Sequence, residues 1–276
     1  MYEQISRNKW KSAALVIFFF AFIYSRFGPE LSAALALPML GMRQLYKTNV
    51  ALQKINEELL QLMVAAIEAR DPYTSGHSQR VSRYARVIAK SAGLGSRATE
   101  RVMIAALLHD VGKIYEEFAP ILRKPGRLTD GEFEVMKTHA SRGSALVCKV
   151  SHFEDLVPMV QSHHEAWDGR GYPDGVSGDD IPTGARIIAL ADTIDAMSTS
   201  RPYRPALSDA EVRSELKRES GRQFDPRICK ALLNDTTWAM LRREMALAVA
   251  EHPVNNDATA DIEQLSSRAN VLEAHA

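Results

Sequence analysis

The hydrophobic positions at the start of the chain form two uncharged stretches, residues 12–24 and 31–42, separated by a segment that contains Arg26 and Pro29. Each stretch is shorter than the roughly 20 apolar residues that a membrane-spanning helix needs. Basic residues flank the pair on both sides, which suits a hairpin with both ends in the cytoplasm. We therefore expect residues 1–42 to be a hydrophobic membrane anchor: a tight hairpin, a tilted single pass or the remnant of a longer anchor. A secretory signal is the alternative.

From Leu45 to Ala66 the apolar positions recur at alternating spacings of three and four residues. This spacing is the a/d seam of a coiled coil, although an amphipathic helix that packs on its own domain shows a similar stripe. The segment lies between the expected anchor and a domain with the features of an enzyme. We therefore favour a linker helix over residues 43–64 that forms a homodimer through residues 45–66.

The rest of the chain predicts helix after helix, and strand signals are absent. Apolar spacing and capping signals predict helices over residues 76–92, 97–111, 130–149, 152–165, 184–200 and 209–219, with a further helix opening at Pro226. The capping signals are Thr129 with Glu132, Ser208 with Glu211, and Asp225 with Pro226. We expect an all-α helical bundle over residues 65–250, interrupted by a glycine-rich loop over 167–183, and a disordered polar tail over 251–276.

Composition limits the partners that such a domain could have. The 34 basic residues balance 34 acidic ones, so the chain has no overall field that would attract nucleic acid, and we expect no direct nucleic-acid binding. Any anionic ligand needs a local basic cluster. The two cysteines, Cys148 and Cys229, lack the spacing of a metal or redox motif, and we expect both to be small buried side chains in a reducing compartment.

Two short segments carry most of the candidate chemistry. Leu-His-Asp-Val-Gly-Lys occupies residues 108–113, and His-His-Glu-Ala-Trp-Asp-Gly-Arg-Gly-Tyr-Pro occupies residues 163–173. A lone histidine on a helix is more often a hydrogen-bonded core or surface residue than a metal ligand. Adjacent His-Asp and His-His pairs, however, let one backbone segment offer two donors of the kind that suit iron, manganese or zinc.

Together these segments resemble the HD-GYP family, a branch of the HD metal-hydrolase superfamily that cleaves the bacterial messenger cyclic di-GMP. The resemblance extends roughly from Ala65 to Leu233. It implies seven metal ligands, which are His77, His109, Asp110, His139, His163, His164 and Asp192. Asp110 would bridge two ions about 3.5–4 Å apart, with His109 and Asp192 on one and His139, His163 and His164 on the other. Glu165 and Asp168 are candidates to orient ligating imidazoles, and Asp195 is either such a residue or a helix-face acid.

The chain departs from the family pattern at Tyr73. Some family members have a glutamate at this place, four residues before the first histidine, and that carboxylate accompanies a third metal ion. Because Tyr73 cannot replace it, we expect two divalent metal ions, iron or manganese, and no third one.

Phosphodiester hydrolysis also needs a proton donor for the leaving 3′ oxygen and cations for the phosphates. Lys113 lies four residues after His109, on the same face if the helix continues, and the resemblance implies that Asp71 pairs with it. It also implies that Arg201 and Arg204 hold the phosphates, as guanidinium groups do well. The alternatives are a solvated lysine at a helix end and a charged turn.

These observations predict a cyclic di-GMP phosphodiesterase, in which water activated by two metal ions yields linear pGpG, GMP or both. The catalytic domain would lie in the cytoplasm at the bacterial inner membrane. One alternative is a weakly catalytic receptor or adaptor that contacts proteins such as diguanylate cyclases through its Gly-Tyr-Pro loop. Another is a phosphodiesterase for a mixed cyclic dinucleotide.

Overall fold

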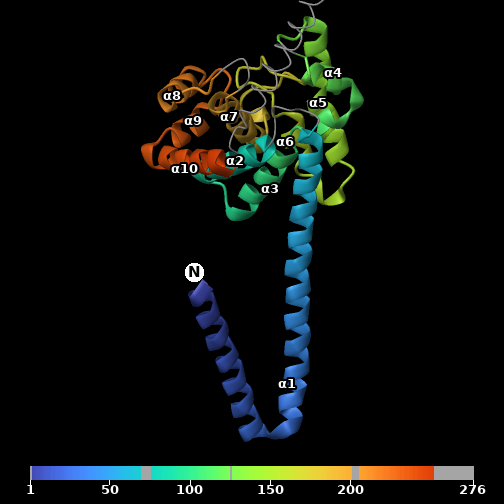
Figure 1. Cartoon of the computed structure of the whole chain (residues 1–276), viewed down its shortest axis with the longest axis vertical. Coiled ribbons are helices and arrows are strands. Elements are labelled where there is room, and N and C mark those ends of the chain that lie inside the picture. The colour runs from blue at the N-terminus through green and yellow to red at the C-terminus, as the bar shows by residue number, and fades with distance from the viewer. Residues whose placement is uncertain (1, 70–75, 125, 201–204, 252–276) are drawn as a thin grey trace, which may run out of the picture. The chain divides into compact units, whose positions relative to one another are not determined.

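The structure, a computed structural model, describes residues 2–69, 76–124, 126–200 and 205–251 (Figure 1). The regular secondary structure of these residues is helical, with one isolated β-bridge between Ser220 and Phe224 and no strand among them. The predicted all-α class is therefore confirmed for this part of the chain. The chain divides into two compact units, Met1–Leu60 and Gln61–Ala276. The second unit begins inside the predicted linker helix.

Helix α1 (Tyr2–Glu68) contains the two N-terminal apolar stretches and the predicted linker. It is broken at Gly28, where φ is 84°, a value that side-chain-bearing residues rarely adopt. The prediction of a membrane anchor at the bacterial inner membrane is wrong, because none of the helices in the described residues combines the length and the apolar character needed to cross a bilayer. Leu45, Leu52 and Leu59 are exposed along α1. The predicted homodimer through residues 45–66 stays a prediction.

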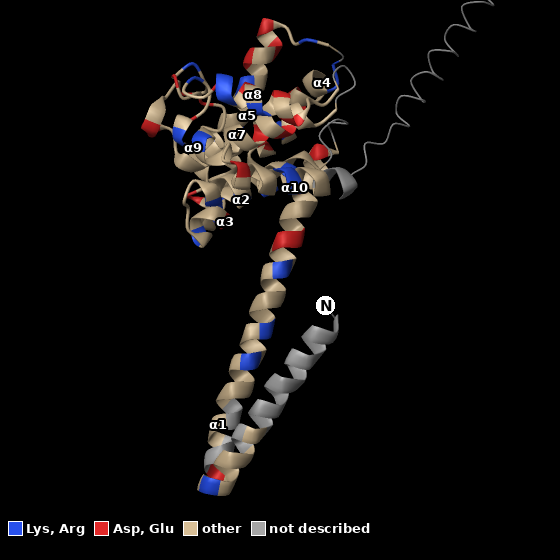
Figure 2. Cartoon of the chain, turned by 90° about the vertical axis from the view of Figure 1, so that its left-hand side faces the viewer, with Lys and Arg blue, Asp and Glu red and all other residues tan. Residues whose placement is uncertain are grey.

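The second unit consists of helices joined by turns and loops. They are α2 (His77–Ser91), α3 (Ser96–Leu108), α4 (Ala119–Leu122), α5 (Asp130–Val147), α6 (Val157–Gln161), α7 (Thr183–Ser198), α8 (Asp209–Arg218), α9 (Pro226–Leu232) and α10 (Asp235–Glu251). Short 3₁₀ helices are η1 (Val111–Ile114), η2 (Glu116–Phe118), η3 (Ser151–Phe153) and η4 (Gly178–Asp180). Figure 2 shows acidic and basic residues interspersed over the face of this unit that it presents, as the balanced composition suggests.

Local capping explains where several of these helices begin. Thr129 and Ser208 each accept a hydrogen bond from the amide of the residue three positions on, and the glutamates there accept from the cap amides in return. Glu132 also accepts a hydrogen bond from Lys124 Nζ. The hydrogen bonds from Lys124 and Thr129 together lower the pKa of Glu132 to about 2. Asp225 caps α9, whose first residue is a proline. All three predicted caps are confirmed.

Two predicted helices are shorter than expected. The helix predicted over 97–111 ends at Leu108 and gives way to η1. The helix predicted over 152–165 is instead η3 followed by α6, with Pro158 in the first turn of α6. Proline has no amide hydrogen and its ring clashes with the preceding turn, so a helix can start at Pro158 but cannot run through it.

Helices α2, α3 and α7 pack together and form the core of the unit. Ile88, Ala105 and Ile194 are completely buried there. Full burial of one such isoleucine contributes roughly 1.5–3 kcal/mol. Cys229 is also buried, as predicted, but Cys148 is exposed. Cys148 caps the end of α5 and points outward, so the prediction that it is buried is wrong.

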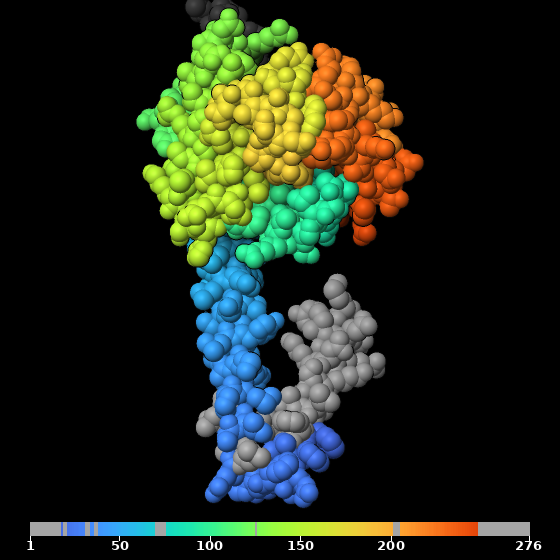
Figure 3. Space-filling model, turned by 180° about the vertical axis from the view of Figure 1, so that it is seen from behind, coloured from blue at the N-terminus to red at the C-terminus, as the bar shows by residue number. Residues whose placement is uncertain are grey.

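The loop over residues 167–183 is held down at its first residue. The guanidinium groups of Arg186 and Arg227 both lie over the Trp167 ring, at 5.6 and 5.2 Å from its centroid, and Asp179 pairs with both arginines. The backbone amide of Trp167 donates to the carbonyl of Gln223. In Figure 3 the yellow surface of the segment with this loop lies between the green surface of α5 and the orange surface of α8 and α9.

Candidate metal centre

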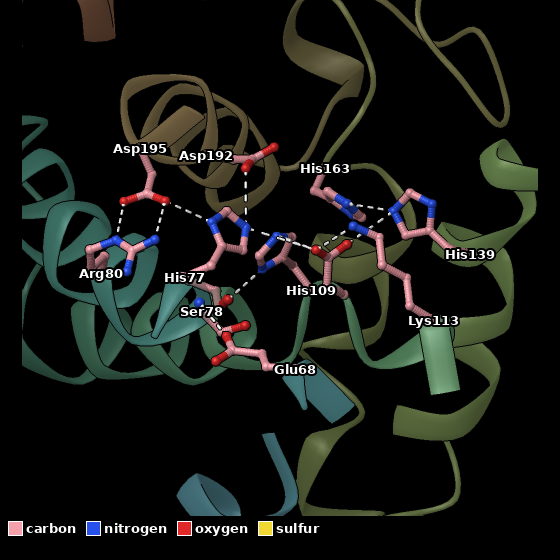
Figure 4. A network of polar contacts seen from close by, with 12 residues as sticks. Glu68, His77, Ser78, Arg80, His109, Lys113, His139, His163, Asp192 and Asp195 are labelled. Carbon is pink, nitrogen blue, oxygen red and sulfur yellow. Dashed lines mark hydrogen bonds and ion pairs between the residues drawn. The ribbon is translucent and has the colours of Figure 1, made fainter. Parts of the chain in front are cut away.

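The structure brings all seven predicted metal ligands together. Within each of three groups, the potential ligand atoms lie within 4.8 Å of one another: His139 with His163 and His164, His77 with His109 and Asp192, and His109 with Asp110 and His163. The side chains come from five places in the second unit, which are the start of α2, the turn after α3, the middle of α5, the turn after α6 and the middle of α7 (Figure 4).

Backbone carbonyls orient three of the imidazoles. The Nδ1 atoms of His109, His139 and His163 lie 2.6–2.7 Å from the carbonyl oxygens of Ala106, Met136 and Val160, each three residues earlier. A carbonyl oxygen only accepts hydrogen bonds, so Nδ1 must carry the hydrogen in each ring. When such a ring is neutral, its Nε2 carries no hydrogen, and the lone pair of Nε2 points toward the cluster.

These lone pairs face one another without hydrogens between them. The Nε2 atoms of His139 and His163 are 3.3 Å apart. Burial lowers the pKa of His139 to about 4 and holds the pKa of His163 well below its usual value, so both rings are neutral at pH 7. Two acceptor atoms at this distance repel each other unless a cation lies near both, which fits a shared metal ion.

Asp110 lies at the middle of the cluster. Its Oδ1 is buried and accepts no hydrogen bond from the described residues, and it lies 3.3 Å from the Nε2 of His139. Its Oδ2 is 3.5 Å from the Nε2 of His109. Burial opposes the charge of Asp110, but Lys113 and the surrounding histidines outweigh burial and hold its pKa well below the usual range. An ionised carboxylate beside the neutral imidazoles of His139 and His163 is a donor set that divalent iron, manganese or zinc would satisfy.

His77 is oriented by side chains rather than by its own helix. Its Nδ1 donates to Asp195 Oδ2 at 2.8 Å, which leaves Nε2 facing Asp192 Oδ1 at 3.4 Å. Asp195, only 2% exposed, also accepts two hydrogen bonds from Arg80. Burial opposes the charge of Asp195, but His77 and Arg80 together lower its pKa. Sequence reasoning left the role of Asp195 open and missed Arg80, although each lies three residues beyond a predicted ligand on its helix.

Lys113 reaches the cluster by a different route from the predicted one. The α-helix does not continue past Leu108, and η1 instead brings Lys113 Nζ to 2.6 Å from Asp110 Oδ2. Four other residues of the prediction, namely Asp71, Tyr73, Arg201 and Arg204, lie outside the described residues.

Glu165 and Asp168 have other partners than imidazoles. Glu165 Oε1 accepts hydrogen bonds from the amides of Asp174 and Gly175, while Asp168 pairs with Arg170. Glu165 therefore shapes the loop that follows the paired histidines. The Tyr172 ring of this loop lies 4.8 Å from the ring of His164, which brings the Gly-Tyr-Pro segment back to the cluster.

An open pocket of about 500 Å³ adjoins the cluster. His164 and Asp192 form the end nearest to the other ligands. The remaining walls come from α7, α8 and the segments beside them, at Thr193, Ala196, Met197, Leu207, Glu215, Gln223 and Phe224. Its size falls within the range of small-molecule sites, which is about 300–1,000 Å³.

Comparisons with known proteins match this part of the chain. A family model described as "HD domain" matches residues 61–228. A 3′3′-cGAMP-specific phosphodiesterase 2 of Vibrio cholerae is 36% identical over 67% of this chain and 35% of its own length. The cyclic di-GMP phosphodiesterase response regulator RpfG of Xanthomonas campestris is 40% identical over 64% of this chain and 47% of its own length. The chain thus spans less than half of either relative.

A crystal structure of a cyclic GMP-AMP-specific phosphodiesterase from V. cholerae aligns with a TM-score of 0.50 and 20% identity. The alignment covers 68% of this chain and 53% of that one. At this identity the likeness concerns the fold, which is shared over most of the chain.

Proposed function

We propose that this chain, which belongs to the HD-GYP branch of the HD domain family, hydrolyses a phosphodiester bond of a cyclic dinucleotide. The proposed substrate is cyclic di-GMP. The observation that carries this proposal is the convergence of neutral imidazole nitrogens around the buried Asp110 oxygen, beside an open pocket. A cluster of this kind suits metal-assisted hydrolysis better than it suits a purely structural core.

We propose that the donors serve two neighbouring metal ions around Asp110, as the family resemblance implies. We assign His109 and Asp192 to one divalent ion and His139, His163 and His164 to the other, with Asp110 between them. His77 joins the first set, because its Nε2 faces Asp192. When bound, two such ions lower the pKa of a nearby water and neutralise charge on the phosphate. Iron and manganese suit this mixture of imidazole and carboxylate donors.

Lys113 is the proposed proton donor for the leaving oxygen. Its Nζ donates a hydrogen bond to Asp110 Oδ2 at 2.6 Å, so it lies at the cluster. We propose that Asp71 pairs with it, and that Arg201 and Arg204 bind the phosphates. In support of the arginines, the pocket walls include Met197 and Leu207, which flank their segment in the chain.

The choice between cyclic di-GMP and 3′3′-cGAMP is a matter for experiment, since relatives of both names match the chain. The full chain, loaded with Mn(II) or Fe(II), is incubated with each cyclic dinucleotide, and the products are separated by chromatography. We expect turnover of cyclic di-GMP to pGpG or GMP. Preferential turnover of 3′3′-cGAMP would instead establish the mixed cyclic dinucleotide as the substrate.

The matched variants are Asp110→Ala and Asp155→Ala. Asp155 pairs with Arg101 at the surface and serves as the control. Loss of the central carboxylate is expected to reduce turnover at least about 100-fold, since even partners behind the ligands contribute 10–100-fold. No turnover by the metal-loaded wild type would overturn the proposed activity. Retained turnover by Asp110→Ala would overturn the assigned site.

A further inference from the structure

Helix α2 begins without a side-chain cap of its own. Its N-cap is Gly76, whose φ of 70° suits glycine and which offers no side-chain acceptor. The first amides of a helix have no partner within the helix and need one from elsewhere. Glu68, the last residue of α1, supplies it: Oε2 accepts from the amide of Gly76 and Oε1 from the amide of Ser78, each at 2.7 Å.

His77 lies between these two amides. Because one carboxylate binds the residues on both sides of His77, it fixes the backbone from which the imidazole projects (Figure 4). The ring is fixed at its other end by Asp195. His109, His139 and His163 are each oriented by a carbonyl of the chain just before them, whereas His77 depends on contacts from other helices. A negative charge is also favourable at a helix N-terminus.

The end of α1 contacts the surroundings of the cluster as well. Val64, Ile67 and Glu68 line a narrow cavity whose other walls include His77, Asp110 and Lys113. Val64 is buried, with 4% of its surface exposed. The final turns of α1 are therefore packed against the cluster as part of the same unit.

We infer that Glu68 is a positioning residue, which couples the last turn of α1 to the candidate metal centre by clamping the amides on both sides of His77. Its carboxylate holds His77 Nε2 toward Asp192. This inference rests on the proposed function only in taking His77 as a metal ligand. It concerns metal affinity and local backbone protection, so it can be tested without any substrate.

The test compares the full-length wild type with Glu68→Gln, in which one acceptor oxygen becomes an amide nitrogen. In the metal-free proteins, hydrogen exchange at the amides of residues 76 and 78 is expected to be faster in the variant. Titration with Mn(II) is expected to show about tenfold weaker binding, the lower end of the range for residues that orient ligands. With substrate, kcat should fall while KM changes little, because the pocket walls are untouched.

Two further variants separate the clamp from other effects. Glu57→Gln makes the same change at an exposed position of α1 and should match the wild type throughout. Glu68→Asp keeps the charge but retracts the carboxylate by one methylene, so weaker Mn(II) binding is expected if the clamp acts through geometry. If Glu68→Gln does not fold, the same measurements are made on Glu68→Asp. Wild-type Mn(II) affinity in the folded variants overturns the inference. If the metal-loaded wild type shows no turnover while the Glu68 variants bind Mn(II) more weakly than the wild type, only the proposed activity is overturned.

Discussion

In four of the predicted ligands, which are His77, His109, His139 and His163, an acceptor binds the Nδ1 hydrogen and so leaves Nε2 to face the cluster. For His109, His139 and His163 that acceptor is a carbonyl of the same segment. For His77 it is Asp195, which Arg80 holds in turn. A ligand set of this kind depends on residues that contact no metal themselves, because they decide which nitrogen offers its lone pair.

Replacing Asp195 with alanine is expected to weaken metal binding and folding together. His77 would lose the acceptor for its Nδ1 hydrogen, and Mn(II) affinity, measured by calorimetric titration, should fall about 10–100-fold. Arg80 would remain buried without this carboxylate, so the free energy of unfolding of the metal-free protein should fall by about 3 kcal/mol in a denaturant titration.

Asp155→Ala is the matched control for Asp195→Ala, since it removes an aspartate from an arginine pair at the surface. A surface pair of this kind contributes about 0–1 kcal/mol. Unchanged Mn(II) affinity in Asp195→Ala would show that the His77 ring is held in place without Asp195.

At the scale of elements, the close packing of η1 on α5 determines how Asp110 meets His139. A side chain at Gly112 would place its Cβ 2.0 Å from the carbonyl oxygen of His139 and 2.6 Å from the amide of Gly143. The two segments can approach this closely only because Gly112 lacks a Cβ. The turn after α3 and the middle of α5 therefore bring their ligands together through backbone contact.

Two glycine-to-alanine changes are expected to have opposite effects on stability. Gly112→Ala must push η1 away from α5, at a cost of about 1–3 kcal/mol, and should also weaken Mn(II) binding. Gly131→Ala, in the first turn of α5, meets open space and should stabilise the fold by about 0.4–1 kcal/mol. Both free energies come from denaturant unfolding. A neutral Gly112→Ala would contradict the tight approach of η1 to α5.

At the scale of the whole molecule, metal ions would join segments that are far apart in the sequence. The predicted ligands come from α2, the turn after α3, α5, the turn after α6 and α7, all in the second unit. Ions bound by all of them favour the folded state, because the unfolded chain cannot present these donors together. Metal binding is therefore expected to stabilise the fold as well as to support catalysis.

Mn(II) at about 100 times its dissociation constant is expected to raise the free energy of unfolding by roughly 2.7 kcal/mol for each ion bound. Thermal unfolding with and without Mn(II) measures this gain, and a chelator should reverse it. Asp155→Ala should gain as much as the wild type, whereas Asp110→Ala should gain less. Equal melting temperatures with and without Mn(II), for the wild type, would argue against a metal centre at these residues.

The sequence alone determined the helical class, the starts of the capped helices and the seven residues that cluster. The helical class and the helix starts depend on residue types at short, fixed spacings, which act before any distant segment arrives. The seven ligands, spread from His77 to Asp192, were implied by the resemblance to the HD-GYP family. Thr129 with Glu132 is such a signal, and so is the pair His109 and Asp110 within its motif. The membrane anchor was predicted from the apolar stretches and their basic flanks, but none of the helices in the described residues is both long and apolar enough to cross a bilayer.

Only the tertiary structure decided which residues support the cluster. Asp195 with Arg80, Glu68 with the amides beside His77, and the partners of Glu165 join positions from different elements. The end of α3 at Leu108 was likewise decided by its neighbours, since η1 packs on α5 where an α-helix would otherwise continue. A sequence pattern records which donors and acceptors a chain carries. Which of them meet depends on how the helices pack, because a hydrogen bond requires both atoms within about 3 Å.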